Sequence, residues 1–170
     1  AKKVARYPVD ACLVSETWRE DGYTSLFVVR KKANGRRALM SLLVDLGCLG
    51  IKQSYFDFDT SEREVDETRR GMFPEQSPVE ISVDLAARIV QHATAWSQKS
   101  GLDADPATYA AEAFLSEADW RQSDEPIPLG KDGKPFYYPG PRDDWEPVVE
   151  KLRDELGEEG FNYFVPMDGS

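Results

Sequence analysis

Histidine and cysteine are scarce in this sequence, which holds one histidine and two cysteines among 170 residues. A structural zinc site needs four ligands, more than His92, Cys12 and Cys48 supply together. Two cysteines are also too few for a disulfide framework and are typical of a protein in the reducing cytoplasm. We therefore expect a cytoplasmic protein with no bound metal and no cofactor.

Long apolar segments are absent as well. No apolar run approaches the roughly 20 residues that span a bilayer. The first ten residues, AKKVARYPVD, lack the apolar core of a signal peptide. We expect no contact with a membrane and no secretion signal in this stretch. Ala1 is not a natural start, so we expect further residues to precede it in the full-length protein.

Charge is distributed unevenly along the chain, whose net charge is −10. Residues 1–71 hold 13 Lys+Arg and 11 Asp+Glu, whereas residues 72–170 hold 8 and 20. The overall composition, 41% hydrophobic and 31% charged, is typical of a globular protein. The acidic half is either an ordinary solvated surface or a face for a partner.

Three strands are predicted in the first 45 residues. The longest apolar run of the chain, LMSLLVDLGCLGIK, begins at Leu39, and its first half is typical of a buried strand. This strand spans Arg36–Asp45, and β-forming residues predict two more over Pro8–Val14 and Tyr23–Lys32. The pair Asn34-Gly35 predicts a type I′ turn between the last two strands. The result is a three-stranded antiparallel meander.

Helix signals follow in the middle of the chain. Ser61 and Glu64 have the spacing of a capping box for a short charged helix. Asp57, Asp59 and Thr60 are expected to form a polar loop before it, while Tyr55, Phe56 and Phe58 could extend a strand or pack on the sheet. Residues 74–78 are the best candidate for a boundary between lobes 1–73 and 79–170, which could also be one compact domain. Two further helices are predicted, one from Ser82 or Asp84 to Gly101 and one with Asp105 as its cap and Pro106 as its first residue.

The last forty residues predict a small ββαβ unit. Strands over Ile127–Leu129 and Pro135–Tyr138 flank the turn at 130–133, a helix capped by Asp143 or Asp144 ends at Gly157, and a last strand spans Phe161–Val165. The predicted fold class is therefore α+β, with an antiparallel three-stranded meander, helices and this C-terminal ββαβ unit.

Five cations surround the predicted hairpin turn: Arg30, Lys31, Lys32, Arg36 and Arg37. A basic β-ribbon of this kind could bind a phosphate backbone, since lysine and arginine displace its condensed counterions. The alternative is a solvated turn whose charges prevent the strand ends from pairing with other chains.

A second candidate site follows the buried strand, where Asp45, Cys48 and Lys52 lie within eight residues. Lys52 could lower the pKa of Cys48 and so activate a nucleophile. Alternatively, Asp45 caps the turn, Cys48 packs as a small apolar residue, and Lys52 pairs with Asp45 or extends to solvent.

Two further groupings involve distant residues. Asp45 could join Asp57 and Asp59 in a carboxylate site for Mg²⁺, although a polar loop is the simpler interpretation. His92, the only histidine, could act as a base for Cys48, but it lies on the apolar stripe of a helix, where core packing is more usual.

Two motifs together resemble a family of uncharacterised bacterial proteins. LLVDLGCLGIK (Leu42–Lys52) resembles its Val-Asp-x-x-Cys-Leu-Gly-x-Lys signature, and GKDGKPFYYPGPRDDWEPVVEKL (Gly130–Leu152), followed by GFNYF, resembles its C-terminal signature. The resemblance implies that Asp45, Cys48, Gly50 and Lys52 form one family feature, and it implies no particular activity. The sequence departs from the family pattern at His92 and at residues 104–107.

Three hypotheses of function follow. The first is a non-enzymatic cytoplasmic binding or adaptor protein, which contacts another protein through its acidic half or its sheet face. The second is a nucleic-acid-binding module that uses residues 30–37. The third is a thiol- or metal-dependent hydrolase centred on Asp45 and Cys48.

Overall fold

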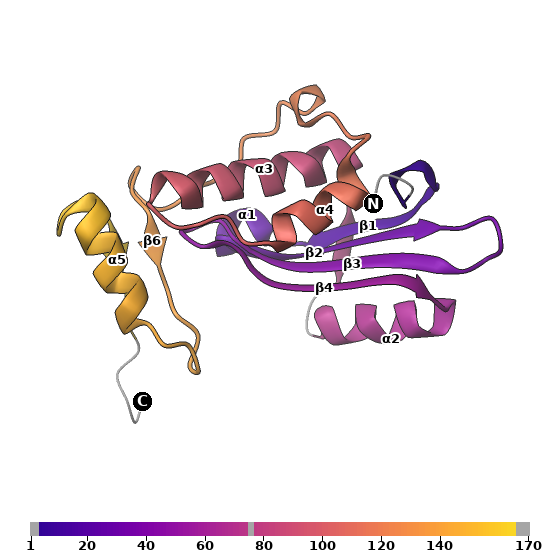
Figure 1. The fold of residues 1–170 in the computed structure, drawn as a ribbon, viewed down its shortest axis with the longest axis horizontal. Helices are drawn as coiled ribbons and strands as arrows, with labels where there is room; N and C mark the ends of the chain where they lie inside the picture. Colours follow the sequence, from indigo (N-terminus) through magenta and orange to yellow (C-terminus); the bar gives the residue numbers. More distant parts are fainter. Residues whose placement is uncertain (1–3, 75–76, 166–170) are drawn as a thin grey trace.

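A computed structural model describes residues 4–74 and 77–165 and shows a mixed α+β fold, with a five-stranded antiparallel sheet and helices on both faces (Figure 1). The strand order is β4-β3-β2-β1-β5. The strands of this sheet are β1 (Val9–Ser15), β2 (Tyr23–Lys31), β3 (Arg37–Asp45), β4 (Gly50–Thr60) and β5 (Pro78–Glu80). The helices are α1 (Trp18–Asp21), α2 (Glu62–Met72), α3 (Val83–Lys99), α4 (Ala107–Leu115) and α5 (Glu146–Leu156), with 3₁₀ turns at Val4–Arg6 and Trp120–Gln122.

The three strands predicted from the sequence are present as β1, β2 and β3, and two more flank them. The expected polar loop at 57–60 is wrong, because these residues belong to the eleven-residue strand β4. Since β4 lies at the edge of the sheet, exposed polar residues such as Ser54 and Asp59 face solvent without cost to the core. The alternation expected of a half-buried strand is therefore weak in β4.

The turn between β2 and β3 also differs from the prediction. A type I′ turn needs positive φ at both Asn34 and Gly35, but only Gly35 has it, at 85°. The amide of Lys32 donates to the carbonyl of Arg36 (2.8 Å), so the loop holds three residues, 33–35. In three-residue loops only the last residue needs the left-handed conformation, which glycine adopts freely.

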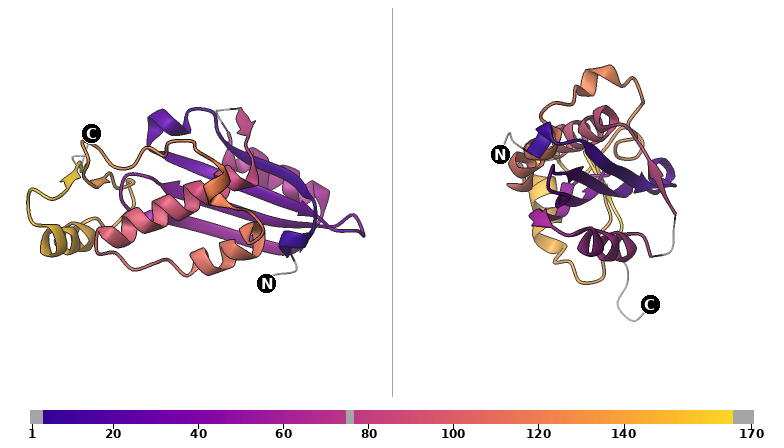
Figure 2. Two further views of the ribbon diagram at one scale, coloured as in Figure 1. Left: turned by 90° about the horizontal axis from the view of Figure 1, so that it is seen from above. Right: turned by 90° about the vertical axis from the view of Figure 1, so that its right-hand side faces the viewer.

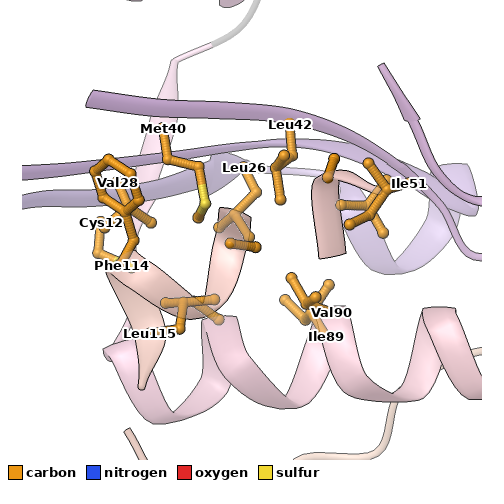
Figure 3. Packing of buried hydrophobic residues seen from close by; sticks show 14 of the residues in the cluster. Cys12, Leu26, Val28, Met40, Leu42, Ile51, Ile89, Val90, Phe114 and Leu115 are labelled. Atoms are coloured by element: carbon orange, nitrogen blue, oxygen red, sulfur yellow. The ribbon is translucent and has the colours of Figure 1, made fainter. Parts of the chain in front are cut away.

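Each face of the sheet has its own core. On one face, β-strand residues such as Leu26, Met40 and Leu42 point toward Ile89 of α3 and Phe114 of α4 (Figure 3). On the other face, strand residues that alternate with them pack against Val65 of α2: Leu13, Phe27, Val29 and Leu39. Views from above and from the end show α3 and α2 on opposite faces (Figure 2).

Helix starts follow local hydrogen-bond chemistry. Ser61 and Glu64 form the predicted capping box at α2, and the Ser82 side chain accepts from the amide of Leu85 at α3 (3.1 Å). The Asp105 carboxylate accepts from the amide of Ala107 (2.8 Å), but the N-cap of α4 is Pro106 and its first residue is Ala107, one position later than predicted. Asp143 does not cap α5, whose N-cap is Trp145, because its carboxylate has other partners.

The C-terminal segment forms a small unit beside one end of the sheet (Figure 1). Its two short strands, β6 (Phe136–Tyr137) and β7 (Asn162–Tyr163), pair in parallel, and α5 is the crossover between them. Residues 127–129 are not a strand, since Ile127 and Leu129 pack against the core under α3. A tight turn at Asp132-Gly133 is present, bridged between Lys131 and Lys134.

The core under α3 and α4 takes residues from both predicted lobes, from Cys12 on β1 to Leu115 on α4. Residues 75 and 76 of the predicted boundary lie outside the described residues. So do residues 1–3, the start of the stretch in which we expected no secretion signal. In residues 4–74 and 77–165, no helix combines the length and the apolar character needed to cross a bilayer.

Candidate binding site at the junction of two motifs

Four of the five hairpin cations form hydrogen bonds or ion pairs within the protein. Arg30 is buried, and its guanidinium donates to the carbonyls of Tyr7 (3.0 Å) and Phe114 (2.5 Å). Burial lowers the pKa of Arg30. Arg37 is buried too, and pairs with Asp10 at 3.1 Å. These two arginines therefore fasten neighbouring segments to the sheet.

Two further cations share one carboxylate. Lys32 and Arg36 both contact Asp59 on β4, at 3.2 and 3.0 Å, and their hydrogen bonds lower the pKa of Asp59. Within the described part of the chain, Lys31 is the one cation of this cluster whose side chain has neither an ion pair to a carboxylate nor a hydrogen bond to a carbonyl. The five side chains are close in sequence, but two of them are buried and two share the carboxylate of Asp59.

The loop after β3 is organised by Asp45. Its carboxylate accepts from the amides of Gly47 (2.8 Å) and Leu49 (3.0 Å), so it caps the turn as the structural alternative predicted. Burial raises the pKa of Asp45, and the backbone hydrogen bonds and Lys52 oppose that shift. Asp45 therefore determines the path of this loop.

Cys48 is fully buried in a small core made by the C-terminal unit. It packs with Tyr137, Val149, Leu152 and Phe161. Burial, together with the charge of Asp45, raises the pKa of its thiol to about 12, so the thiol is protonated near neutral pH. Activated cysteines have the opposite environment, exposed and electropositive.

Lys52 reaches across to the C-terminal unit. Its ammonium lies 2.6 Å from the carboxylate of Asp143, and that carboxylate also accepts from the amide of Gly140 (2.6 Å). These contacts lower the pKa of Asp143. The partner of Lys52 is therefore Asp143, and not Asp45 as the sequence analysis considered.

The two motifs singled out in the sequence meet at this place. The amide of Gly130 donates to the carbonyl of Leu46, and the amide of Phe136 donates to that of Gly47, both at 2.9 Å. The indole of Trp96 donates to the same Gly47 carbonyl (2.9 Å). A side chain at position 47 would collide with the carbonyl oxygen of Phe136, so glycine is required by this close approach.

A cleft of about 710 Å³ opens where the motifs meet. We call it the junction cleft. Its lining combines aromatic rings, carboxylates and two lysines, and comes from α1, the adjoining strands and the C-terminal unit: Glu20, Asp21, Gly22, Tyr23, Leu43, Asp45, Gly47, Lys52, Gly130, Lys131, Phe136, Tyr138 and Gly140. Of these, only Asp45 and Lys52 were candidates from the sequence. Gly130, Lys131, Phe136, Tyr138 and Gly140 belong to the C-terminal motif, but the sequence alone assigned them no role in a site, because the cleft exists only once distant segments meet.

The sheet face beside the junction cleft is open. Register places Ser25, Leu43 and Gln53 in one row across β2, β3 and β4, and Ser41 and Tyr55 in the next. The last turn of α2 reaches the second row, where Ser41 pairs with Phe27 and the Ser41 hydroxyl lies 2.8 Å from the sulfur of Met72. The rest of the helix covers Val29 and Leu39, which lie further toward the hairpin. A second hollow of about 320 Å³ lies over these two rows and shares Leu43 with the cleft. We call this region the open sheet face.

The remaining candidates are not brought together. The ring of His92 lies against Trp120 (5.4 Å between centroids) and near the carbonyl of Arg88 (3.0 Å), away from the core that holds Cys48. Asp59 pairs with cations at the hairpin end of the sheet, whereas Asp45 lies at the other end of β3. Among the described residues there is no group of three potential metal ligands.

A cavity of about 630 Å³ separates α3 from α4 on the opposite face. Alanines and other small residues form much of its lining, and Glu112 is its one charged residue. This cavity therefore differs in chemistry from the junction cleft.

Comparison of the chain with protein families, with curated proteins and with solved structures gives no match. The resemblance of the two motifs to a bacterial family therefore stays a prediction.

Proposed function

We propose that this chain is a non-enzymatic binding protein that holds a partner protein against its open sheet face and junction cleft. The observation that carries the proposal is the exposure of three tyrosines around these hollows. Tyr23, Tyr55 and Tyr138 are 56%, 52% and 55% exposed. Tyrosine is enriched among the residues that dominate binding energy in protein interfaces, because its large ring also carries a polar hydroxyl.

The rigidity of the surroundings supports this assignment. The open sheet face is made of three paired strands, and the cleft walls are fixed by backbone hydrogen bonds from Gly130 and Phe136. The ring of Tyr138 stacks on Phe164 (5.4 Å between centroids), which restricts its orientation. Side chains held in place before binding lose little conformational entropy when the partner arrives.

The chemistry of the candidate catalytic residues favours binding over catalysis. Cys48 is buried and protonated, and Asp45 accepts two backbone hydrogen bonds. His92 contacts neither of them through any hydrogen bond or ring contact that the structure contains. We also propose that the protein acts in the cytoplasm, a reducing compartment, because both cysteines are unpaired.

The test compares two surfaces of the same protein. A variant with Tyr23, Tyr55 and Tyr138 all changed to serine is used as bait in quantitative affinity capture from cells that express the chain. The matched control is Tyr109→Ser, since Tyr109 is 72% exposed on α4, away from the open sheet face. We expect proteins captured by the wild type to be lost with the triple variant and kept with the control. Equal capture by all three baits would contradict the proposal.

A further inference from the structure

We propose that the junction cleft receives an arginine side chain from a basic segment of the partner. This inference rests on the proposed function and adds the chemistry of the group that is recognised. It is argued from the charges, the aromatic rings and the size of the cleft.

The charges of the lining favour a cationic guest. Three carboxylates line the cleft, those of Glu20, Asp21 and Asp45, together with the ammonium groups of Lys52 and Lys131. Lys52 is already paired with Asp143 at 2.6 Å. Lys131 is therefore the one lining cation that is free of a carboxylate among the described residues, while Glu20 and Asp21 are exposed on α1.

The aromatic rings offer faces for a cation. The ammonium of Lys131 lies 5.6 Å from the centroid of Phe136, so one ring of the cleft already accepts a cation on its face. The rings of Tyr23 and Tyr138 are more than half exposed and have no cation over them in any ring contact of the structure. Phe164 stacks on one face of Tyr138, so Tyr138 offers at most its other face to a cation, and Tyr23 has no ring stacked on it among the described residues.

Arginine fits this combination better than lysine. Its guanidinium is planar, stacks on an aromatic ring and donates two parallel hydrogen bonds to one carboxylate. Glu20 supplies a carboxylate with no hydrogen bond or ion pair among the described residues, whereas Asp21 accepts from the hydroxyl of Thr17 (2.6 Å). The volume of about 710 Å³ is ample for one side chain with its flanking peptide.

The chain as a whole supports the same partner chemistry. Its net charge is −10. A negatively charged protein attracts basic segments during encounter, and this attraction weakens as salt rises. Both recognition of arginine in the cleft and this long-range attraction therefore favour a basic partner.

The test uses three synthetic peptides that differ at one position. Acetyl-Gly-Arg-Gly-amide is titrated into the ¹⁵N-labelled protein, and the same titration is done with citrulline and with glutamate in place of arginine. Citrulline keeps the shape of arginine but has no charge. We expect the arginine peptide to shift the amide resonances of Gly22, Tyr23 and Lys131, and to bind at least about tenfold more tightly than the citrulline peptide.

Two variants locate the interaction. Glu20→Gln combined with Asp21→Asn is expected to weaken binding of the arginine peptide by about tenfold, because the charge-assisted hydrogen bonds are lost. Both residues are exposed, and the melting temperature verifies that the variant is folded. Glu112→Gln removes one charge from the cavity between α3 and α4 and should leave binding unchanged.

Equal binding of the arginine and citrulline peptides, tighter binding of the glutamate peptide, or shifts confined to α3 and α4 would each overturn the inference. These results leave the proposed function intact if the three tyrosines still control capture of the partner. Conversely, tyrosine variants that capture normally would contradict the proposed function whatever the peptides do.

Discussion

The two ends of the β2–β3–β4 surface use charged residues in opposite ways. At the hairpin end, Arg30 and Arg37 are buried and Asp59 neutralises two further cations. At the junction end, carboxylates and lysines line an open cleft. The hairpin has the denser charge in the sequence, yet its charges stabilise the fold. The density of charge along a chain therefore does not identify which charges remain unpaired, because the partner of each charge depends on the fold.

The hairpin end and the junction end of this surface also differ in how far α2 covers them. On the face that holds α2, apolar side chains at the hairpin end pack under the helix. Serines, a glutamine, one tyrosine and Leu43 occupy the corresponding positions at the junction end. Strands β2 and β3 pair without a register shift from the part that α2 covers to the part that it leaves open. The boundary between the two parts is therefore marked by the change in side-chain type.

The largest loss of stability is expected from a substitution that fills the close contact between the two motifs. Gly47→Ala places a Cβ against the carbonyl oxygen of Phe136, and because that atom belongs to the backbone, the C-terminal unit must move. We expect a loss of about 3 kcal/mol in the free energy of unfolding, measured by urea denaturation.

A second glycine provides the control for this change. Gly71 lies in α2 and a Cβ there would meet no atom within 4 Å. Gly71→Ala should leave the stability unchanged or raise it by about 0.5 kcal/mol, because alanine favours helices. If Gly47→Ala proved as stable as Gly71→Ala, the close approach of the motifs would be disproved.

The next effect concerns the hairpin end. Arg30→Met removes the donor for the carbonyls of Tyr7 and Phe114, and leaves the buried Phe114 carbonyl without this partner. We expect a loss of about 2 kcal/mol in the free energy of unfolding. Lys31→Met at the neighbouring exposed position should change it by less than about 0.5 kcal/mol. Equal effects at the two positions would show that Arg30 is not a structural residue.

A smaller effect is expected from the ion pair that joins the two motifs. Lys52→Met, Asp143→Asn and the double variant form a double-mutant cycle. The coupling energy should be about 0.5–1 kcal/mol, since both side chains remain partly exposed and solvent screens the pair. A coupling energy of zero would mean that other contacts hold the motifs together.

The pH dependence of this pair has a definite sign. The folded-state pKa of Asp143 is lowered from 3.8, so the unfolded chain binds its proton more readily. The contribution to stability is complete above the unfolded value, and is lost as pH falls below 3.8 through the folded value. Asp143→Asn should therefore flatten the acid limb of the stability curve, as measured by thermal unfolding between pH 5 and pH 2.5.

Local chemistry explains what the sequence predicted well. The capping box of Ser61 and Glu64 and the cap at Ser82 depend on residues three positions apart, so spacing alone identifies them. The strands β1 to β3 were predicted from runs of β-forming residues, in which either one face or both faces of the strand are buried. By contrast, β4 was missed in part because an edge strand tolerates polar residues that are typical of loops.

Tertiary contacts explain what was missed. The sequence offered Asp45 as the nearest partner for Lys52, but the fold brings Asp143 to it from the C-terminal unit. Likewise, Tyr23 and Tyr138 are ordinary residues of strand-like segments until Gly130 and Phe136 join the loop after β3. The junction cleft could not be predicted from spacing, because hydrogen bonds between distant segments create it.

The smallest effect is predicted for nucleic acid at the hairpin. Only Lys31 of the five hairpin cations lacks an ion pair or a buried carbonyl partner in the described structure. Each phosphate contact contributes a slope of about 0.9 to the dependence of log K on log salt. Anisotropy titrations of labelled DNA and RNA should therefore give a slope no greater than about 1 from this surface, which Lys31→Gln abolishes. A slope of about 3 or more that is lost in the combined variant of Lys31, Lys32 and Arg36 to glutamine would show that the ion pairs to Asp59 open for phosphate. That result would make the two ends of the sheet alike in function, since both would then present their charges to a partner.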